Sequence, residues 1–290
     1  MCVHYAIGCL FIPFINRGDP ISERWQLPYL HTMKMRSTFP TTVKQFLEQG
    51  ERYYLPHLSV DCVVFGFHDG HLKVLLLELS DTREWCLPGG FIQHAEPMDD
   101  AAVRIVNDRT GLKNVYLRQF YAFGDPTRQR GKVKTQIPKG AKATSWIMKR
   151  FITIGYWALV EFSKAVPIPD QFSSQCCWVN VAKIPSLILD HNLILGKALQ
   201  SLRLSLNDYP VGKDLLSEKF TMPELQRLYE TVLNKRLDRR NFQKQILSLG
   251  ILHKLNEKKQ GGAHKSPFLY RFDKRKYQLA LKQGLKAKFV

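Results

Sequence analysis

The stretch from Gly90 to Leu112 holds the residues whose types and spacing could carry chemistry. Gly90, Glu96, Arg104 and Gly111 follow one another with five, seven and six residues between them, and apolar Leu112 closes the series. Residues three and four apart lie on one face of a helix, so acidic side chains at such spacings form a cluster. Clustered carboxylates hold Mg²⁺, which neutralises phosphate charge and activates water. A cluster of carboxylates on such a helix would support metal-assisted chemistry on a phosphate compound.

The spacing, preceded by the run WCLPGG, resembles the Nudix box, the loop, helix and loop of enzymes that cleave nucleoside diphosphates linked to another group. In those enzymes three helix positions that hold the metal all carry Glu; here they are Ile105, Asp108 and Arg109. One acid survives, one position is apolar, and the third has the wrong charge for a cation site. The resemblance implies that the fold remains. We expect no catalytic residue, no metal and no cofactor, with Glu96, Arg104 and Asp108 as residual box positions.

Two alternatives stay open. An active Nudix hydrolase acting on ADP-ribose or a sugar nucleotide would use Glu96 and Asp108 with further acids such as Asp99 or Asp100, and would bind Mg²⁺ weakly. A chance match of an ordinary turn and amphipathic helix is the other alternative, and the four spaced residues with their Gly-Gly approach count against it.

Strands and helices that could position this box flank it in the sequence. Leu58–Phe67 and the run LKVLLLEL surround Asp69 and Gly70, which is a strong hairpin signal. Strand-like runs follow at VYLRQFYAFG, ITIGYWALVEF and CCWVNVAKIP, and Asp190 precedes an amphipathic helix. A mixed sheet with interspersed helices over residues 55–206 fits the α/β/α sandwich that the resemblance implies.

The charge of the chain is concentrated near its C-terminus. The 290 residues carry a net charge of +18, and residues 213–290 hold 19 Lys and Arg against 7 Asp and Glu. A polyanionic partner is therefore expected. The sequence contains no apolar run long enough for a membrane span.

This basic region, residues 207–290, has the order helix, helix, strand, loop, strand of a winged helix-turn-helix. Thr221 and Glu224 have the spacing of a capping box that opens the first helix. Asp238 can cap the second, RRNFQKQILSLG, which Gly250 ends. The strand-like runs ILHKL and FLYRF flank the loop NEKKQGGAHKSP, the expected wing.

A recognition helix presents its N-terminal residues to the major groove, where Arg and Asn pair with guanine and adenine while Lys mainly holds phosphate. The predicted DNA-binding residues are Arg239, Arg240, Asn241 and Lys244 on the second helix and Lys258, Lys259, His264 and Lys265 on the wing. A merely solvated charged face is the alternative. The coincidence of these charges with both DNA-facing elements favours DNA.

The degraded box followed by FTMPELQRLYETVLNKRLDRRNFQKQIL resembles the Nudix-related transcriptional regulators, in which the box region senses a ligand and a winged helix binds an operator. GYWALV and WVNVAKIPSLILDH are most similar to arabinose-responsive regulators of Bacteroides-type bacteria, and other members sense ADP-ribose. The resemblance implies a homodimer, double-stranded operator DNA, and a pentose or ADP-ribose effector in the Nudix pocket. A non-specific nucleic-acid binder is a third possibility.

The expected effector-binding residues are Trp85, Glu96, Arg104, Phe123 and Asp125. Core packing is an equally open reading for Trp85, and an internal ion pair is one for Glu96 with Arg104.

Three further features complete the sequence. Residues 1–54 are expected to form an N-terminal extension, poorly ordered at its start, within which Met33 or Met35 would make plausible starts. An insertion near 132–150 lacks acidic residues and predicts a solvated basic loop, with contact to nucleic-acid phosphates as the secondary possibility. The six cysteines lack CxxC spacing, which predicts reduced thiols and a cytoplasmic protein.

Overall fold

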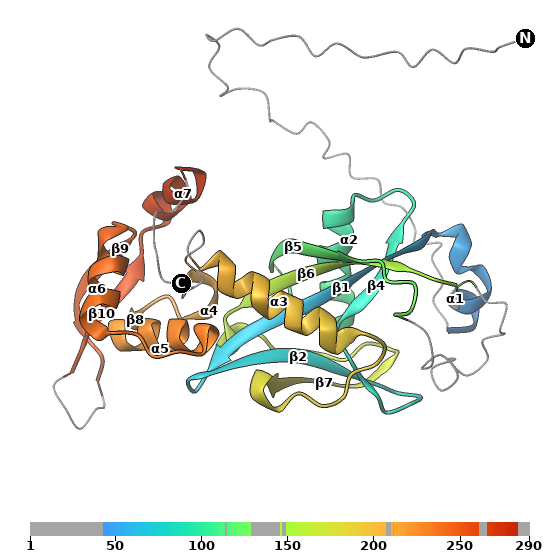
Figure 1. Ribbon diagram of the computed structural model, residues 1–290, viewed down its shortest axis with the longest axis horizontal. Helices are drawn as coiled ribbons and strands as arrows, with labels where there is room; N and C mark the ends of the chain where they lie inside the picture. Colours follow the sequence, from blue (N-terminus) through green and yellow to red (C-terminus); the bar gives the residue numbers. More distant parts are fainter. Residues whose placement is uncertain are drawn as a thin grey trace, which may run out of the picture. The chain divides into compact units, whose positions relative to one another are not determined.

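The computed structural model describes residues 43–113, 115–128, 146, 149–206, 210, 212–260 and 266–283 (Figure 1). Several predictions lie outside the described residues: those for residues 1–42, for most of the insertion near 132–150, and for His264 and Lys265 of the wing.

The first part of the described chain alternates strands and helices around the predicted box. Its elements are α1 (Val43–Gln49), η1 (Gly50–Arg52), β1 (Tyr54–His68), β2 (His71–Leu79), β3 (Trp85–Cys86), β4 (Gly89–Gln93), α2 (Met98–Thr110), β5 (Tyr116–Phe123), β6 (Ile152–Val160), η3 (Phe162–Lys164), β7 (Ser173–Asn180), η4 (Val181–Lys183) and α3 (His191–Ser205).

One mixed sheet joins these strands in the order β3-β2-β1-β6-β5, with β4 paired to β1 and β7 paired to β2. β1 and β6 run parallel from Leu58 to Gly66 of β1, and the other pairs are antiparallel. Asp69 and Gly70 form the turn between β1 and β2, with φ values of 51° and 75°. Positive φ at both turn residues favours the Asp-Gly pair, so the predicted hairpin is confirmed.

The two faces of the sheet are covered by different helices, because side chains alternate along each strand. Cys62 and Val64 of β1 pack with α2, whereas Val63 and Phe65 pack on the other face with α3. Figure 1 shows α3 crossing the sheet along β6 and β1. The predicted α/β/α sandwich is therefore present. Leu193 of α3, which shares the apolar helical spacing, is 55% exposed and lies outside this core.

The C-terminal elements form a second, smaller unit of helices and a three-stranded sheet. They are α4 (Gly212–Leu215), β8 (Phe220–Thr221), α5 (Met222–Leu233), α6 (Arg239–Ser248), β9 (Leu252–Lys258), β10 (Phe268–Phe272) and α7 (Lys274–Gln283), with strand order β8-β10-β9. Thr221 Oγ1 accepts from the N–H of Glu224, and the Glu224 carboxylate accepts from the N–H of Thr221, so the capping box is complete. This arrangement is a winged helix extended by α7, which the sequence analysis did not predict.

The described cysteines agree with the expectation of free thiols. Cys62, Cys86, Cys176 and Cys177 form no disulfide. Burial raises the pKa of the Cys86 and Cys176 thiols to about 12 in each case, so neither forms a thiolate at neutral pH. Within the described part of the chain, no helix has the length and apolar character needed to cross a membrane.

Candidate functional site

An ion pair joins the loop before α2 to the helix itself. Arg104 donates from Nε and Nη2 to the two Glu96 carboxylate oxygens over 2.9 and 2.6 Å, and from Nη2 to the carbonyl of Phe91 over 2.8 Å. Glu96 also accepts from the backbone N–H of Gln93. Burial lowers the pKa of Arg104, but the bond to Glu96 together with the charges of Glu96 and Asp108 outweighs it, and the net shift is upward. The structure thus shows the internal ion pair that braces the loop on the helix.

Two of the three helix positions that hold metal in Nudix enzymes serve packing here. Ile105 is 1% exposed, and a Cβ built on Gly90 would lie 3.0 Å from its side chain. Arg109 Nη1 donates to Asp170 Oδ2 over 2.5 Å, which ties α2 to the segment before β7. Asp108 lies on the exposed side of α2. Ile105 and Arg109, the two residues that replace metal-binding carboxylates of the box, therefore both contribute to the packing of the fold.

The acids that a hydrolase would recruit are not gathered around Asp108. Asp99 and Asp100 lie in the first turn of α2, and Asp99 accepts a 2.5 Å bond from the hydroxyl of Tyr156. Among the residues that the structure describes, no group of three His, Cys, Asp or Glu side chains could hold a metal ion. These residues do not fit the divalent cation that the Nudix box implies.

A buried polar network lies on the other face of the sheet, where α3 begins. Arg128 donates from Nε and Nη2 to the two carboxylate oxygens of Asp190, over 2.9 Å each, and its side chain is 4% exposed. Arg128 Nη2 also lies 3.7 Å from Asp61 Oδ2. Asp61 accepts from the Thr153 hydroxyl over 2.8 Å, and His191 Nε2 lies 3.7 Å from its other oxygen. Segments far apart in the sequence thus meet in one buried cluster of charges.

The sequence analysis missed this network, although Asp61 carried a signal. It is an acid within the apolar run LSVDCVVFGF, and a buried carboxylate needs charged or hydrogen-bonding partners. A Cβ on Gly89 would collide with Asp61 Oδ1, so glycine gives the carboxylate room. His191 Nδ1 accepts the backbone N–H of Leu87 over 3.0 Å. The network therefore touches the chain that enters the box.

The predicted effector residues fall into two groups on opposite faces of the sheet. Glu96 and Arg104 lie on the α2 side. Trp85 packs half-buried against the core on the α3 side, and Phe123 is 4% exposed within that core. Asp125 is exposed and accepts two hydrogen bonds within its own turn. The five predicted residues therefore do not line one site in the structure.

Trp146, within the insertion that was predicted to be a solvated loop, is buried. Its indole is 5% exposed, stacks on Tyr54 with ring centroids 6.0 Å apart, and meets Phe91 and Phe151 edge-on. A Cβ on Gly50 would collide with the indole ring. Trp146 therefore packs beside the loop of the box.

Helix α6 has a buried side and a basic, exposed side. Phe242 and Ile246 are buried. Its exposed polar residues are Arg239, Arg240, Asn241 and Lys244. Asp238 Oδ1 accepts the backbone N–H of Asn241 over 2.9 Å, which fixes the first turn. The side chains predicted to face DNA are thus exposed to solvent on a helix whose N-terminus is capped.

The two described lysines of the wing differ in their surroundings. Lys259 Nζ bonds the Glu224 carboxylate of α5. Burial raises the pKa of Glu224, but the bonds from Lys259 and Thr221 outweigh it, so the pKa is lowered. Lys258 Nζ lies 5.2 Å from the centre of the Phe268 ring and is exposed on β9. Both cations remain within reach of a polyanion that approaches the wing.

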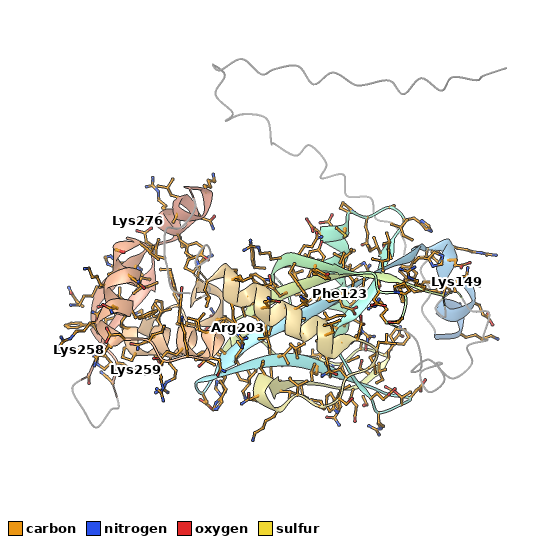
Figure 2. All side chains as sticks on the ribbon, viewed as in Figure 1. Phe123, Lys149, Arg203, Lys258, Lys259 and Lys276 are labelled. Atoms are coloured by element: carbon orange, nitrogen blue, oxygen red, sulfur yellow. The ribbon has the colours of Figure 1, made fainter. Side chains whose placement is uncertain are left out.

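Helix α3 also contacts the C-terminal unit. Arg203 Nε donates to the carbonyl of Val232 in α5 over 2.9 Å (Figure 2 labels Arg203 on α3). Thr231 Oγ1 donates to the carbonyl of Gly70 in the β1–β2 turn over 3.1 Å. A cavity of about 320 Å³ lies at this junction, lined by that turn, by the segment after β6 and by parts of α4 and α5. α3 thus begins at the buried network and ends at α5.

Comparison with known families identifies the first unit. A model of the NUDIX domain matches residues 55–202, just over half of the chain. The chain belongs to the Nudix family. A model of the NrtR DNA-binding winged helix domain matches residues 212–272. The Nudix domain is followed by a DNA-binding winged helix, and the protein is a Nudix-related transcription regulator, as predicted.

Individual relatives share this arrangement. The chain is 28% identical over 249 residues to the ADPR responsive transcriptional repressor NtrR of Acinetobacter baylyi, covering 83% of this chain and 92% of the relative. The structure of Shewanella oneidensis NrtR complexed with a 27mer DNA is similar, with 26% identity, a TM-score of 0.60 and coverage of 76% of this chain and 95% of that chain. Shewanella oneidensis NrtR without DNA matches with 27% identity, the same TM-score of 0.60, and 76% and 96% coverage.

Proposed function

We propose that this protein is a ligand-responsive repressor. Residues 55–206 would sense ADP-ribose or an ADP-ribose-like effector, and residues 207–290 would bind operator DNA within a homodimer. The effector class is supported by the relative from Acinetobacter baylyi, whose name states that it responds to ADPR and represses transcription. A pentose is the alternative effector, because parts of the sequence resemble arabinose-responsive regulators.

This proposal rests on the observation that two metal-binding positions of the Nudix box have a structural role in this protein. Ile105 is buried beneath Gly90, and Arg109 is paired with Asp170, so two metal positions are committed to packing. The recognition helix, in contrast, keeps its basic side exposed. A domain that binds a nucleotide without cleaving it can report that nucleotide's concentration to the attached DNA-binding unit.

Helix α3 offers a physical route for that report. Asp190 and His191 at its start belong to the buried network, and Arg203 near its end bonds the last turn of α5. At 1.5 Å per residue, 15 helical residues span about 22 Å. An effector that shifts the network would move α3 against α5. The contact between α3 and α5 would then differ between the free and the effector-bound protein, which is what coupling between two sites requires.

Exposed apolar side chains support self-association of the Nudix domain. Leu193 and Leu204 on α3 are 55% and 60% exposed, and Tyr121 on the edge strand β5 is 51% exposed. Large apolar side chains gathered on a surface are typical of a protein interface. We assign the homodimer contact to this face of the Nudix domain.

The effector assignment is tested by titrating the protein onto labelled DNA from upstream of its own gene, with and without ADP-ribose, arabinose and other pentoses. We expect ADP-ribose to weaken specific binding at least about tenfold, since allosteric coupling is typically about 1–3 kcal/mol. Mg²⁺-dependent cleavage of ADP-ribose by the purified protein would contradict the sensor assignment and favour the hydrolase. An Arg203→Gln variant should bind ADP-ribose and DNA separately while losing most of the coupling.

The DNA assignment is tested with Arg240→Ala. We expect operator affinity to fall by about 5- to 150-fold, the range for losing one base contact of about 1–3 kcal/mol, with relaxed base preference at one position. Arg83→Ala is the matched control, because Arg83 is an exposed arginine whose partner is Glu78 of the Nudix domain. Unchanged operator binding by Arg240→Ala would refute the role of α6.

A further inference from the structure

The C-terminal helix α7 lies beyond the winged helix domain that the family model matches, which ends at residue 272. It is nevertheless fixed to that domain. Asp273 accepts the N–H of Lys276 over 3.1 Å and donates its own N–H to the carbonyl of Ile251 over 2.9 Å. Tyr277 is 1% exposed, packs edge-on against Phe272, and lies under Lys213 Nζ at 4.6 Å. α7 is therefore a fixed part of the surface.

The charges on α7 have one sign. Its ten residues include Lys274, Arg275, Lys276 and Lys282 and no acidic residue. All four are exposed, and among the described residues no acidic side chain lies within ion-pair distance of any of them. Three of the four lie in the first turn, where the helix dipole favours negative charge. The dipole therefore disfavours these cations. Asp273 at the helix start offsets part of this cost, since the backbone N–H of Lys276 and the charges of Lys276 and Arg275 lower its pKa, and the positive charge that is left unmatched suits an external anion.

The helix presents these cations on the side opposite its anchor. Tyr277 marks the buried side. At 100° per residue, Arg275 and Lys282 lie on nearly the same exposed side, two turns apart, and Lys276 flanks them. Two turns correspond to about 10 Å, a distance over which a DNA backbone presents several phosphates. The spacing suits a run of phosphates better than a single bound anion.

Figure 2 shows Lys276 near one end of the winged-helix elements and Lys258 and Lys259 near the other, with α6 between them. In this view the wing and α7 lie at different ends of the unit that contains α6.

We propose that α7 binds the phosphate backbone of DNA flanking the base pairs that α6 reads. The proposal rests on the proposed function only in requiring that the winged helix binds DNA. Its contribution is independent of base sequence, because phosphate contacts position a protein without specifying bases. The partner is double-stranded DNA, since the charge lies beside a DNA-binding helix.

The test removes three charges from α7 with Lys274→Gln, Arg275→Gln and Lys276→Gln together. The control removes three from exposed positions outside the winged helix with Lys44→Gln, Lys113→Gln and Lys183→Gln. Both are titrated onto a random-sequence duplex several helical turns long over a range of salt. Each lost phosphate contact lowers the slope of log affinity against log salt by about 0.9, so the α7 triple should lose about 2 to 3 and the control almost nothing.

Stability separates a binding effect from unfolding. Removing cations from a helix N-terminus relieves an unfavourable interaction with the dipole, so the α7 triple should melt at the wild-type temperature or slightly above it. A slope equal to that of the wild type, or an equal drop in both triples, would overturn the proposal. If the wild-type protein shows base-specific binding but the α7 triple variant keeps the wild-type salt slope, the proposal for α7 is wrong while the proposed function stands. If the wild type binds no duplex, the proposed function fails with it.

Discussion

Arg128 is the residue whose removal should cost the Nudix domain most, because it neutralises two buried carboxylates. It makes two 2.9 Å bonds to Asp190 and donates to the carbonyl of Phe151 over 3.2 Å. The side chains of Asp61 and Asp190 are 10% and 13% exposed. Replacing Arg128 by Met keeps most of the apolar volume but leaves both acids without their cation.

The size of this effect follows from the burial. Breaking a buried ion pair by removing one partner costs about 3–5 kcal/mol, because an uncompensated charge stays buried. For a domain of this size, that corresponds to a melting temperature lower by roughly 6–20 °C. Asp190→Asn in the Arg128→Met background should restore part of the loss, since the stranded charge is removed.

Denaturant unfolding of the two single variants and the double variant measures this coupling. Arg83→Met is the control: its guanidinium is 67% exposed beside Glu78, and surface pairs contribute less than about 1 kcal/mol. We expect a coupling of about 2–3 kcal/mol between Arg128 and Asp190. Arg128→Met within about 1 kcal/mol of the wild type, or purely additive variants, would refute the view that this network holds α3 to the sheet.

Four further outcomes are expected. Ile105→Glu should lower the free energy of unfolding by more than about 3 kcal/mol in chemical denaturation and should confer no Mg²⁺-dependent hydrolysis, because it buries a charge. Thr221→Ala should cost about 1 kcal/mol in the same assay by removing a helix cap. The lowered pKa of Glu224 means that its interactions stabilise the fold above its ordinary pKa of 4.5, and that this contribution is lost as the pH falls through the lower pKa of the folded protein. The difference in melting temperature between the wild type and Glu224→Gln should therefore shrink over that pH range. Leu193→Asp with Leu204→Asp should shift sedimentation from dimer to monomer while the monomer stays folded, and a persistent dimer would place the interface elsewhere.

The sequence predicted those elements that are determined by residues close together along the chain. The Asp69-Gly70 turn, the capping box of Thr221 and Glu224, and the helix started by Asp238 each depend on residues a few positions apart. The helix that the resemblance to the Nudix box implies spans Met98–Thr110. Such features need no knowledge of the distant chain.

Features that depend on long-range contacts could not be predicted in the same way. Arg128 and Asp190 are 62 residues apart, and Arg109 and Asp170 are 61 residues apart, so nothing local pairs them. α7 was missed because four cations masked a short apolar pattern around Tyr277. That Trp85 and Phe123 contact an effector remains a prediction, since the structure shows only how these two side chains pack within the protein.

The pairing of Arg109 with Asp170, beside the buried Ile105, also bears on how this lineage can change. An Arg109→Glu change would set a new carboxylate against Asp170, and Ile105→Glu would place a charge beneath Gly90. Each step towards a metal-binding box therefore passes through a less stable protein, and neither gains catalysis without the other. A carboxylate cluster could therefore be built at these positions only by substitutions made together, since each one alone would lower stability before a metal ion could be held.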